Sequence, residues 1–146
     1  MFVVDSSVLV IAADRGDPSH EACRGLLEEW RRQPTPWYLT WPIVFEFLGL
    51  VTHPTVYRAP WRLADAWSFV EAVLAAPAVE VLAAGDRHTD IVADLLDRFP
   101  DLRGSQMLET QIAATMIEHG VKRIVTRDTL FHRFPMLEVV DPLRAA

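Results

Sequence analysis

The sequence contains a single cysteine and a single lysine, and the scarcity of cysteine excludes two classes of site. Cys23 alone cannot form an internal disulfide or a cysteine-ligated metal centre. Lys122 is the only lysine, so every other basic residue is an arginine, a side chain suited to bidentate phosphate contacts. No apolar run reaches the roughly 18–20 residues that span a bilayer, and the N-terminus lacks the basic segment of a signal peptide. We therefore expect a cytoplasmic protein with no membrane partner.

The chain also has little positive charge. It contains 14 Lys and Arg residues against 20 Asp and Glu residues, for a formal net charge of −6. The overall field of such a protein does not attract nucleic acid, so contact with RNA requires a local basic patch or a bound metal. The 146 residues are 51% apolar and 23% charged, a composition typical of a folded domain. We expect residues 1–146 to form a single domain.

Short apolar runs rich in β-branched residues alternate with helical patterns along the chain. These runs predict strands over 2–4, 37–40, 79–82, 123–126 and 137–140. The helical patterns cover 8–13, 18–32, 41–52, 61–74, 87–99 and 106–119. The second helix is expected to start at Asp17-Pro18, the third to be capped by Thr40, and the last to end at Gly120. Because strands connected by such helices run parallel, we predict an α/β fold: a three-layer α/β/α domain with a mostly parallel sheet of four or five strands.

Four acidic residues occupy positions where this fold places functional groups. Asp5 and Asp128 each follow a predicted strand, and ligands of open parallel sheets bind outside the carboxyl ends of the strands. Glu46 is the only charge in the apolar helix over 41–52, which we expect to be largely buried. Burying a lone carboxylate is costly without a partner or a metal. Glu109 shares a helix face with the apolar residues three, four and seven positions later.

Each acid also has a simpler interpretation. An acid after a strand is often a turn former or a helix cap. Glu46 can pair with a buried arginine or extend to solvent, and Glu109 can interact with the helix N-terminus. Four acids that meet at one rim, however, raise one another's pKa values unless cations neutralise them. A set of oxygen ligands without Cys or His suits Mg²⁺ or Mn²⁺, ions that activate water for attack on phosphodiesters.

Several motifs follow one another in a specific order. They are Val-Val-Asp-Ser-Ser-Val-Leu at 3–9, Phe-Glu-Phe-Leu-Gly-Leu-Val-Thr-His-Pro at 45–54, Gln-Ile-Ala-Ala-Thr-Met-Ile-Glu-His-Gly at 111–120, Ile-Val-Thr-Arg-Asp-Thr-Leu-Phe-His-Arg-Phe-Pro at 124–135 and Val-Asp-Pro-Leu at 140–143. Together they resemble the PIN-domain ribonucleases, specifically the VapC-type toxins of bacterial toxin–antitoxin pairs. The resemblance covers nearly the whole chain.

The resemblance implies a metal-dependent endoribonuclease whose metal-bound water attacks the scissile phosphate. One or two Mg²⁺ or Mn²⁺ ions would be held by four carboxylates: Asp5, Glu46, Glu109 and Asp128. The hydroxyls of Ser7 and Thr126 are candidates to orient these carboxylates, against the simpler roles of a helix cap and a strand-end hydroxyl. The implied partners are an RNA substrate, a second copy in a homodimer, and a cognate VapB-type antitoxin with a segment over the active site.

Two positions depart from the family pattern. Glu109 stands where the family usually has Asp, and Leu130 stands in place of the second Asp of Thr-x-Asp-x-Asp-Phe. These departures motivate an alternative, a catalytically weakened PIN module that acts mainly as an antitoxin-binding and autoregulatory partner. A phosphotransfer enzyme is a further alternative, although Ser7 occupies the place of the second Asp that a haloacid-dehalogenase-like site requires.

Basic and aromatic residues indicate where RNA would bind. Arg58 and Arg62 flank one predicted turn, and Arg127 lies near the strand end that carries the fourth acid. Each is a candidate contact to the RNA backbone, although a solvated surface is the simpler interpretation. Trp37 and Trp61 are candidates for an exposed aromatic ring that stacks on a base.

Overall fold

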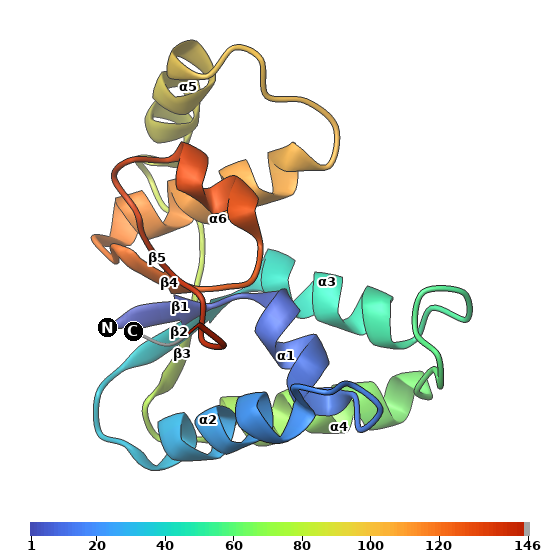
Figure 1. Ribbon diagram of the computed structural model, residues 1–146. Helices are drawn as coiled ribbons and strands as arrows, with labels where there is room; N and C mark the ends of the chain where they lie inside the picture. Colours follow the sequence, from blue (N-terminus) through green and yellow to red (C-terminus); the bar gives the residue numbers. More distant parts are fainter. Residues whose placement is uncertain (145–146) are drawn as a thin grey trace.

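The computed structural model describes residues 1–144, which contain a five-stranded parallel sheet (Figure 1). Its strands are β1 (Phe2–Val4), β2 (Trp37–Thr40), β3 (Val79–Leu82), β4 (Arg123–Val125) and β5 (Glu138–Val140). They lie in the order β3-β2-β1-β4-β5, and each neighbouring pair is parallel. The strand order reverses between β1 and β4, so the carboxyl ends of these two strands define the place where such sheets bind ligands. The predicted parallel sheet is confirmed.

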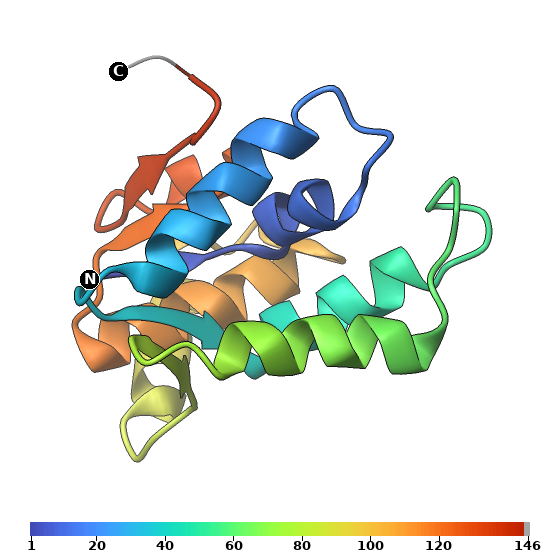
Figure 2. The same ribbon diagram turned by 90° about the horizontal axis from the view of Figure 1, so that it is seen from below.

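Helices cover both faces of this sheet. They are α1 (Ser6–Ala13), α2 (His20–Arg32), α3 (Trp41–Val51), α4 (Leu63–Leu74), α5 (His88–Arg98) and α6 (Gln106–His119), with a 3-10 helix, η1 (Thr129–Arg133), between β4 and β5. In Figures 1 and 2, α5 and α6 lie on one side of the sheet, and α2 and α4 lie on the other. The predicted three-layer α/β/α arrangement is therefore confirmed. Within residues 1–144, no helix combines the length and apolar character needed to span a membrane.

The centre of the sheet is apolar on both faces. All three residues of β1 are buried, and Trp37 of β2 pairs in register with Phe2 on one side and Val79 on the other. The Trp37 ring stacks on Phe2, and its indole N–H donates to the Trp30 carbonyl at 3.0 Å. Trp37 is fully buried, so the prediction that its ring is an exposed base-stacking candidate is wrong. β2 lies between β1 and β3 inside the sheet, so the Trp37 ring is covered by the core and does not reach solvent.

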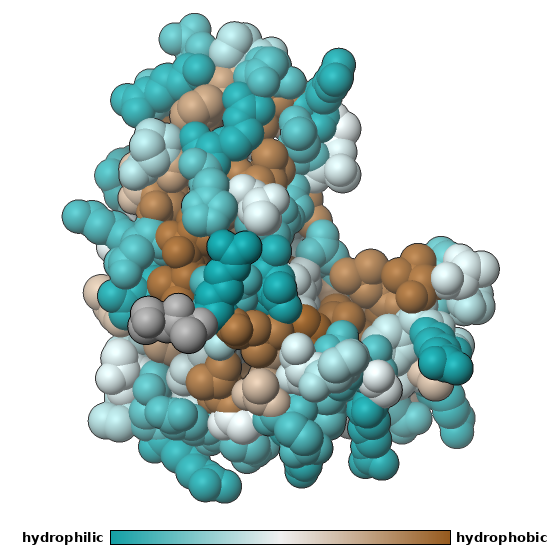
Figure 3. All heavy atoms as spheres, in the orientation of Figure 1, coloured by the Kyte–Doolittle hydropathy of each residue, from teal (hydrophilic) through white to brown (hydrophobic). Residues whose placement is uncertain are grey.

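Helix α3 is less buried than its composition predicts. One face packs in the core through Ile43 and Phe47, but Trp41 and Phe45 on the opposite face are 41% and 67% exposed. Figure 3 shows apolar surface over α3 along one wall of a notch in the molecule. The expectation of a largely buried helix is therefore wrong, because only one side of α3 meets neighbouring elements. The predicted cap is confirmed: the Thr40 hydroxyl accepts the Ile43 N–H at 3.3 Å.

Helix α2 begins at His20, so the predicted start at Asp17-Pro18 is wrong. The Asp17 carboxylate accepts the Ser19 N–H at 2.7 Å, and the Asp17 carbonyl accepts the His20 N–H at 3.0 Å. These bonds form a turn before the helix, as Asp side chains often do. The predicted end of α6 is confirmed. Gly120 closes this helix with a φ of +69°, directly after its last residue.

Candidate active site

Asp5 lies at the carboxyl end of β1, where α1 begins, and is only 3% exposed. Its Oδ2 atom accepts hydrogen bonds from the Thr126 hydroxyl at 2.6 Å and from the Ser7 hydroxyl at 2.9 Å. Asp5 occupies the N-cap position of α1, but its side chain makes no capping hydrogen bond to the helix. Two hydroxyl donors hold this carboxylate in one orientation, and both come from the residues considered for that role in the sequence.

The same hydroxyls connect the end of β1 to the loop that follows β4. The Thr126 hydroxyl oxygen accepts the Asp128 N–H at 2.9 Å, and the Ser7 hydroxyl oxygen accepts the Arg127 N–H at 3.0 Å. Because Thr126 also donates to Asp5, one buried threonine positions the two strand-end acids relative to each other. This arrangement exists only because β1 and β4 are neighbours in the sheet.

Asp128 caps the 3-10 helix η1. Its Oδ1 atom accepts the Leu130 N–H at 2.9 Å, so the turn-former interpretation describes one of its carboxylate oxygens. Leu130, which replaces an acid of the family pattern, therefore contributes a backbone donor that holds Asp128. The capping bond fixes the direction of this carboxylate without burying it completely.

Glu46 approaches Asp5 from α3 and is linked to it through Ser6. The Ser6 hydroxyl donates to Glu46 Oε1 and lies 3.5 Å from Asp5 Oδ1. Ser6 is the first residue of α1 and is 1% exposed. No arginine or lysine of the described chain forms an ion pair with Glu46, so the interpretation as a buried ion pair does not hold.

Sequence reasoning missed Ser6. The only local signal is that two serines follow Asp5 in the sequence. This signal does not indicate which of them, Ser6 or Ser7, contacts Glu46. The packing of α1 against α3 decides that Ser6 meets Glu46, while Ser7 turns toward Thr126.

Glu109 is partly buried in the first turn of α6, where a carboxylate gains from the helix N-terminus. Its Oε2 atom is buried and has no hydrogen-bond partner. Asp128 acts on the Glu109 carboxyl group by a side-chain hydrogen bond that favours its protonated form and by its charge, and Glu46 acts on it by its charge. A buried carboxylate oxygen without a donor is unfavourable, and a bound cation would remove that penalty.

Three of the four predicted site acids have raised pKa values, and burial is the largest cause for each. The pKa of Glu109 rises to about 7, with Asp128 and Glu46 adding to the effect of burial. The hydrogen bond from Ser6 lowers the pKa of Glu46, whereas the charges of Asp5 and Asp128 raise it. Neighbouring carboxylates add to each shift, so these acids lie close enough to repel one another.

The four carboxylates form a series of neighbours rather than a closed cage. Within residues 1–144, no three His, Cys, Asp or Glu side chains are arranged closely enough to hold a metal ion. The donor set nevertheless fits Mg²⁺ or Mn²⁺, because every candidate ligand is an oxygen and Glu109 Oε2 has no other partner. Mg²⁺ usually keeps several waters and binds only one or two carboxylates, so a complete protein cage is not required.

The arginines predicted to contact RNA lie in two separate places. Arg127 follows β4, is 41% exposed at its side chain, and pairs with Asp141 at 3.2 Å. Arg58 and Arg62 lie between α3 and α4, are exposed, and have no ion pair among the described residues. The structure therefore does not bring the three arginines together.

Comparison with known proteins identifies the family. The family model described as PIN domain matches residues 2–136, so the chain belongs to the PIN domain family. Ribonuclease VapC33 of Mycobacterium tuberculosis is 35% identical to it over 144 residues, covering 99% of each chain. Ribonuclease VapC43 of the same organism is 33% identical over 143 residues, covering 98% of this chain and 96% of the relative. Within the PIN domains, the chain belongs to the VapC ribonuclease family.

Solved structures agree with this fold. Mycobacterium tuberculosis VapC20, described as a sarcin-ricin loop cleaving toxin, superposes with a TM-score of 0.68 at 19% identity, covering 97% of this chain and 100% of that one. FitAcB from Neisseria gonorrhoeae gives 0.67 at 17% identity, covering 99% and 100%. VapBC2 from Rickettsia felis, bound to a DNA fragment from its promoter, gives 0.66 at 15% identity, covering 94% and 96%. The predicted PIN-like fold is confirmed.

Proposed function

We propose that this protein is a metal-dependent endoribonuclease toxin that hydrolyses RNA phosphodiester bonds and is paired with an antitoxin. Membership of the VapC ribonuclease family supports the reaction class. The observation that carries the metal dependence is the partnerless, buried Oε2 of Glu109, which lies among the other acids at the switch point of the sheet. A cation is the partner that this oxygen lacks.

The residues of the chain have distinct parts in this proposal. A bound Mg²⁺ or Mn²⁺ would supply Lewis acidity and an activated water for attack at phosphorus. The carboxylates that would hold the ion are Asp5, Glu46, Glu109 and Asp128. Thr126 and Ser7 orient Asp5 by hydrogen bonds. The Ser6 hydroxyl lies between Glu46 and Asp5 and contacts both carboxylates. Such supporting hydrogen bonds typically change metal affinity or activity by about 10–100-fold.

We also propose a cognate VapB-type antitoxin and a homodimer as partners. The solved neighbours include VapBC assemblies from Rickettsia felis and Salmonella typhimurium, and both are bound to DNA. The rings of Trp41 and Phe45, 6.4 Å apart on the outer face of α3, offer an apolar surface for a second copy. A solution mass equal to one chain, measured by light scattering, would contradict the dimer.

A catalytically weakened module is the second candidate function. Glu109 and Leu130 stand where the family pattern has aspartates, and these two residues favour this candidate. In that case the protein would bind its antitoxin without cleaving RNA.

Cleavage of RNA by the purified protein tests the proposal. Mg²⁺ or Mn²⁺ should permit cleavage, EDTA should abolish it, and Asp5→Asn should reduce it by at least about a hundredfold while thermal unfolding shows an intact fold. Absence of cleavage together with absence of Mn²⁺ binding by calorimetry would overturn the metal-dependent nuclease. Absence of cleavage with Mn²⁺ still bound would support the weakened module, and restoration of cleavage by Glu109→Asp would then identify Glu109 as the cause.

A further inference from the structure

A second concave region lies at the other end of α1, away from the acids that follow β1 and β4. Two adjoining hollows meet there and share Arg15 and Trp61 in their walls. The helix between the acids and this region, Ser6–Ala13, spans about 12 Å at 1.5 Å per residue. We call the region the basic hollow and define it by six side chains: Arg15, Arg24, Tyr57, Trp61, Arg62 and Phe69.

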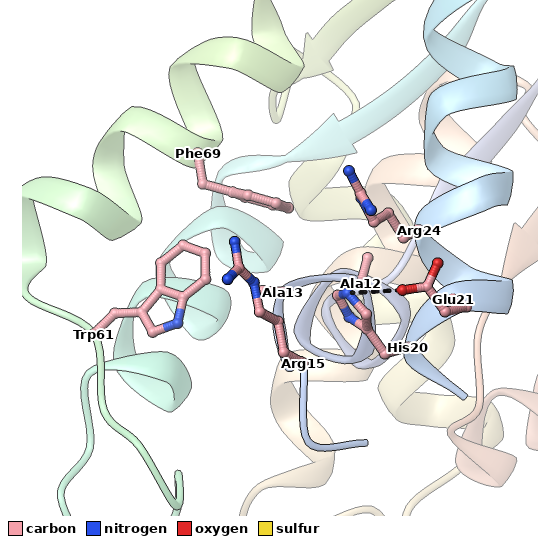
Figure 4. Close-up of a pocket in the computed structure, with 8 residues that line it drawn as sticks. All are labelled: Ala12, Ala13, Arg15, His20, Glu21, Arg24, Trp61 and Phe69. Atoms are coloured by element: carbon pink, nitrogen blue, oxygen red, sulfur yellow. Dashed lines mark ion pairs between the residues drawn. The ribbon is translucent and has the colours of Figure 1, made fainter. Parts of the chain in front are cut away.

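The three arginines of the basic hollow are not neutralised by the chain. Arg15, Arg24 and Arg62 are exposed, and none forms an ion pair within the described residues. Figure 4 shows the guanidinium groups of Arg15 and Arg24 directed into the space beside the Trp61 and Phe69 rings. Uncompensated arginines are conspicuous in a chain with a net charge of −6. Planar guanidinium groups gathered in this way favour phosphate.

Two acids also line the hollow, but neither is paired with these arginines. The Glu21 side chain is 84% exposed, and its carboxylate lies 3.9 Å from His20. Asp65 is in the first turn of α4, where a carboxylate interacts favourably with the helix N-terminus. The guanidinium groups therefore keep their donors available for an anion from outside.

The aromatic wall of the hollow is held rigidly by the core. The Trp61 ring meets Phe69 edge-on at 5.7 Å, and Phe69 stacks on the fully buried Phe47 at 5.1 Å. The Trp61 backbone N–H donates to the Val51 carbonyl at 2.8 Å, which fixes the main chain before α4. Trp61 remains partly exposed, so it presents an ordered ring on which a nucleobase can stack.

Tyr57 supplies an independent sign that a polar ligand belongs here. The residue is 6% exposed, lines the hollow beside Arg15 and Arg62, and has a buried hydroxyl without a hydrogen-bond partner. Burial, with the charges of Asp14 and Asp17, raises its pKa to about 12, so the hydroxyl keeps its hydrogen to donate. Buried donors are rarely left without an acceptor, and a phosphate or ribose oxygen would satisfy this one.

We propose that the basic hollow binds a nucleotide unit of single-stranded RNA, with its phosphate held by Arg15, Arg24 and Arg62 and its base stacked on Trp61. This inference rests on the proposed function and deepens it, because it places substrate RNA at both ends of α1. An acidic protein segment would satisfy the arginines but would need an aromatic side chain at one fixed place to stack on Trp61. The combination of guanidinium groups, an ordered indole and a free hydroxyl matches phosphate, base and sugar in one ligand.

Equilibrium binding of a labelled single-stranded RNA oligonucleotide in EDTA tests this site without cleavage. The double variant Arg15→Gln/Arg24→Gln should bind about tenfold more weakly, and the slope of log affinity against log salt should fall by about 1.4, or about 0.7 per lost phosphate contact. The matched control Arg32→Gln/Arg98→Gln changes two exposed arginines of α2 and α5 and removes the same charge. Equal weakening in both double variants would show an effect of net charge and would overturn the proposal.

Trp61 provides a second, uncharged readout. Trp61→Leu should weaken binding about tenfold without changing the salt slope, and Trp61→Phe should restore most of the affinity. Thermal unfolding of each variant separates a binding defect from misfolding. Unchanged affinity in a folded Trp61→Leu variant would overturn the stacking assignment. Displacement of RNA by an equal charge concentration of poly-glutamate would show that the hollow selects acidic polymers in general, and it would overturn the assignment to RNA.

Cleavage by the wild-type protein separates this proposal from the proposed function. Metal-dependent cleavage combined with unchanged RNA binding by the Arg15→Gln/Arg24→Gln variant would overturn the assignment of the basic hollow as an RNA site. It would still support the proposed nuclease activity. Weaker RNA binding by that variant, in a protein whose wild type never cleaves RNA, would support the hollow and count against the nuclease.

Discussion

The two ends of α1 differ in which charged groups lack an ion-pair partner: carboxylates at one end and arginines at the other. At its N-terminal end, Asp5 and Glu46 have pKa values raised by burial and by neighbouring acids. Beyond its C-terminal end, Arg15 and the other arginines of the basic hollow have no ion pair in the described chain.

Elsewhere the same protein pairs its charges in the ordinary way. Arg133 forms a bidentate salt bridge with Asp101, in which its two terminal guanidinium nitrogens donate to the two carboxylate oxygens at 2.7 and 2.8 Å. These hydrogen bonds lower the pKa of Asp101. Compared with such pairs, the charged groups at the two ends of α1 remain without an ion-pair partner after folding. Groups kept in an unfavourable electrostatic environment are candidates for interaction with an external ion or ligand. The acid end fits a cation, and the basic end fits an anion.

The largest expected effect is on the acid end, where Glu109→Gln should separate stability from activity. Removing this charge should stabilise the metal-free protein at pH 8 by about 1 kcal/mol, less than the full pKa shift implies because Glu109 is only partly buried. RNA cleavage should fall about a hundredfold, and added Mn²⁺ should no longer raise the unfolding temperature.

Chemical denaturation with and without Mn²⁺ measures both stability effects. Glu29→Gln, a change at an exposed glutamate of α2, is the matched control and should alter neither. A metal-free Glu109→Gln protein that is less stable than the wild type would show that the charge of Glu109 is satisfied within the chain.

A smaller effect is expected from the hydroxyl between two of the acids. Ser6→Ala removes the donor shared by Glu46 and Asp5, and the pKa of Glu46 should rise further because that hydrogen bond lowers it. Cleavage should fall about tenfold. Initial rates at saturating Mn²⁺ provide the measurement, with Ser68→Ala on the exposed side of α4 as the control. Equal rates for the two variants would exclude a positioning role for Ser6.

The stability of the acid end should also respond to pH. The pKa of Glu109 is raised from 4.5 to about 7, so the folded state binds its proton more tightly than the unfolded state does. Stability of the metal-free protein should therefore be highest below pH 4.5 with respect to this group, and this contribution should be lost as the pH rises to about 7. Melting temperatures at pH 5 and pH 8 should differ by about 3 °C, and Mn²⁺ should abolish the difference. A melting temperature that rises over this interval would contradict the assignment.

The smallest effect is expected where a basic residue has an internal partner. Arg127 pairs with Asp141, so Arg127→Ala should weaken RNA binding by only about twofold to threefold at low salt and leave the fold intact. Fluorescence anisotropy with the same oligonucleotide measures this change. Unchanged affinity at low salt would remove Arg127 from the RNA contacts, and a loss as large as that of the Arg15→Gln/Arg24→Gln variant would erase the distinction between paired and unpaired arginines.

Much of the fold was predictable because its determinants are local. Each strand is a short apolar run, and β1, β2 and β3 have the predicted bounds. Helix α6 also has its predicted bounds, because Gly120 supplies the left-handed turn that closes it. Helix starts were less predictable: α4 begins at Leu63 rather than at Trp61, whose N–H is held by the Val51 carbonyl in a contact across the chain.

The sequence by itself determined the alternation of strands and helices, the position of Asp5 and Asp128 after strands, and the apolar setting of Glu46. These features depend on residue type and short spacing. Only the tertiary structure decided that Ser6 meets Glu46 across 40 positions and that Thr126 meets Asp5 across 121. It also left one face of α3 exposed, and it assembled the basic hollow from α1, α2, α4 and the loops beside them. The physical reason is that hydrogen bonds and burial depend on side chains that are close in space. The separation of two residues along the chain does not predict whether they come close.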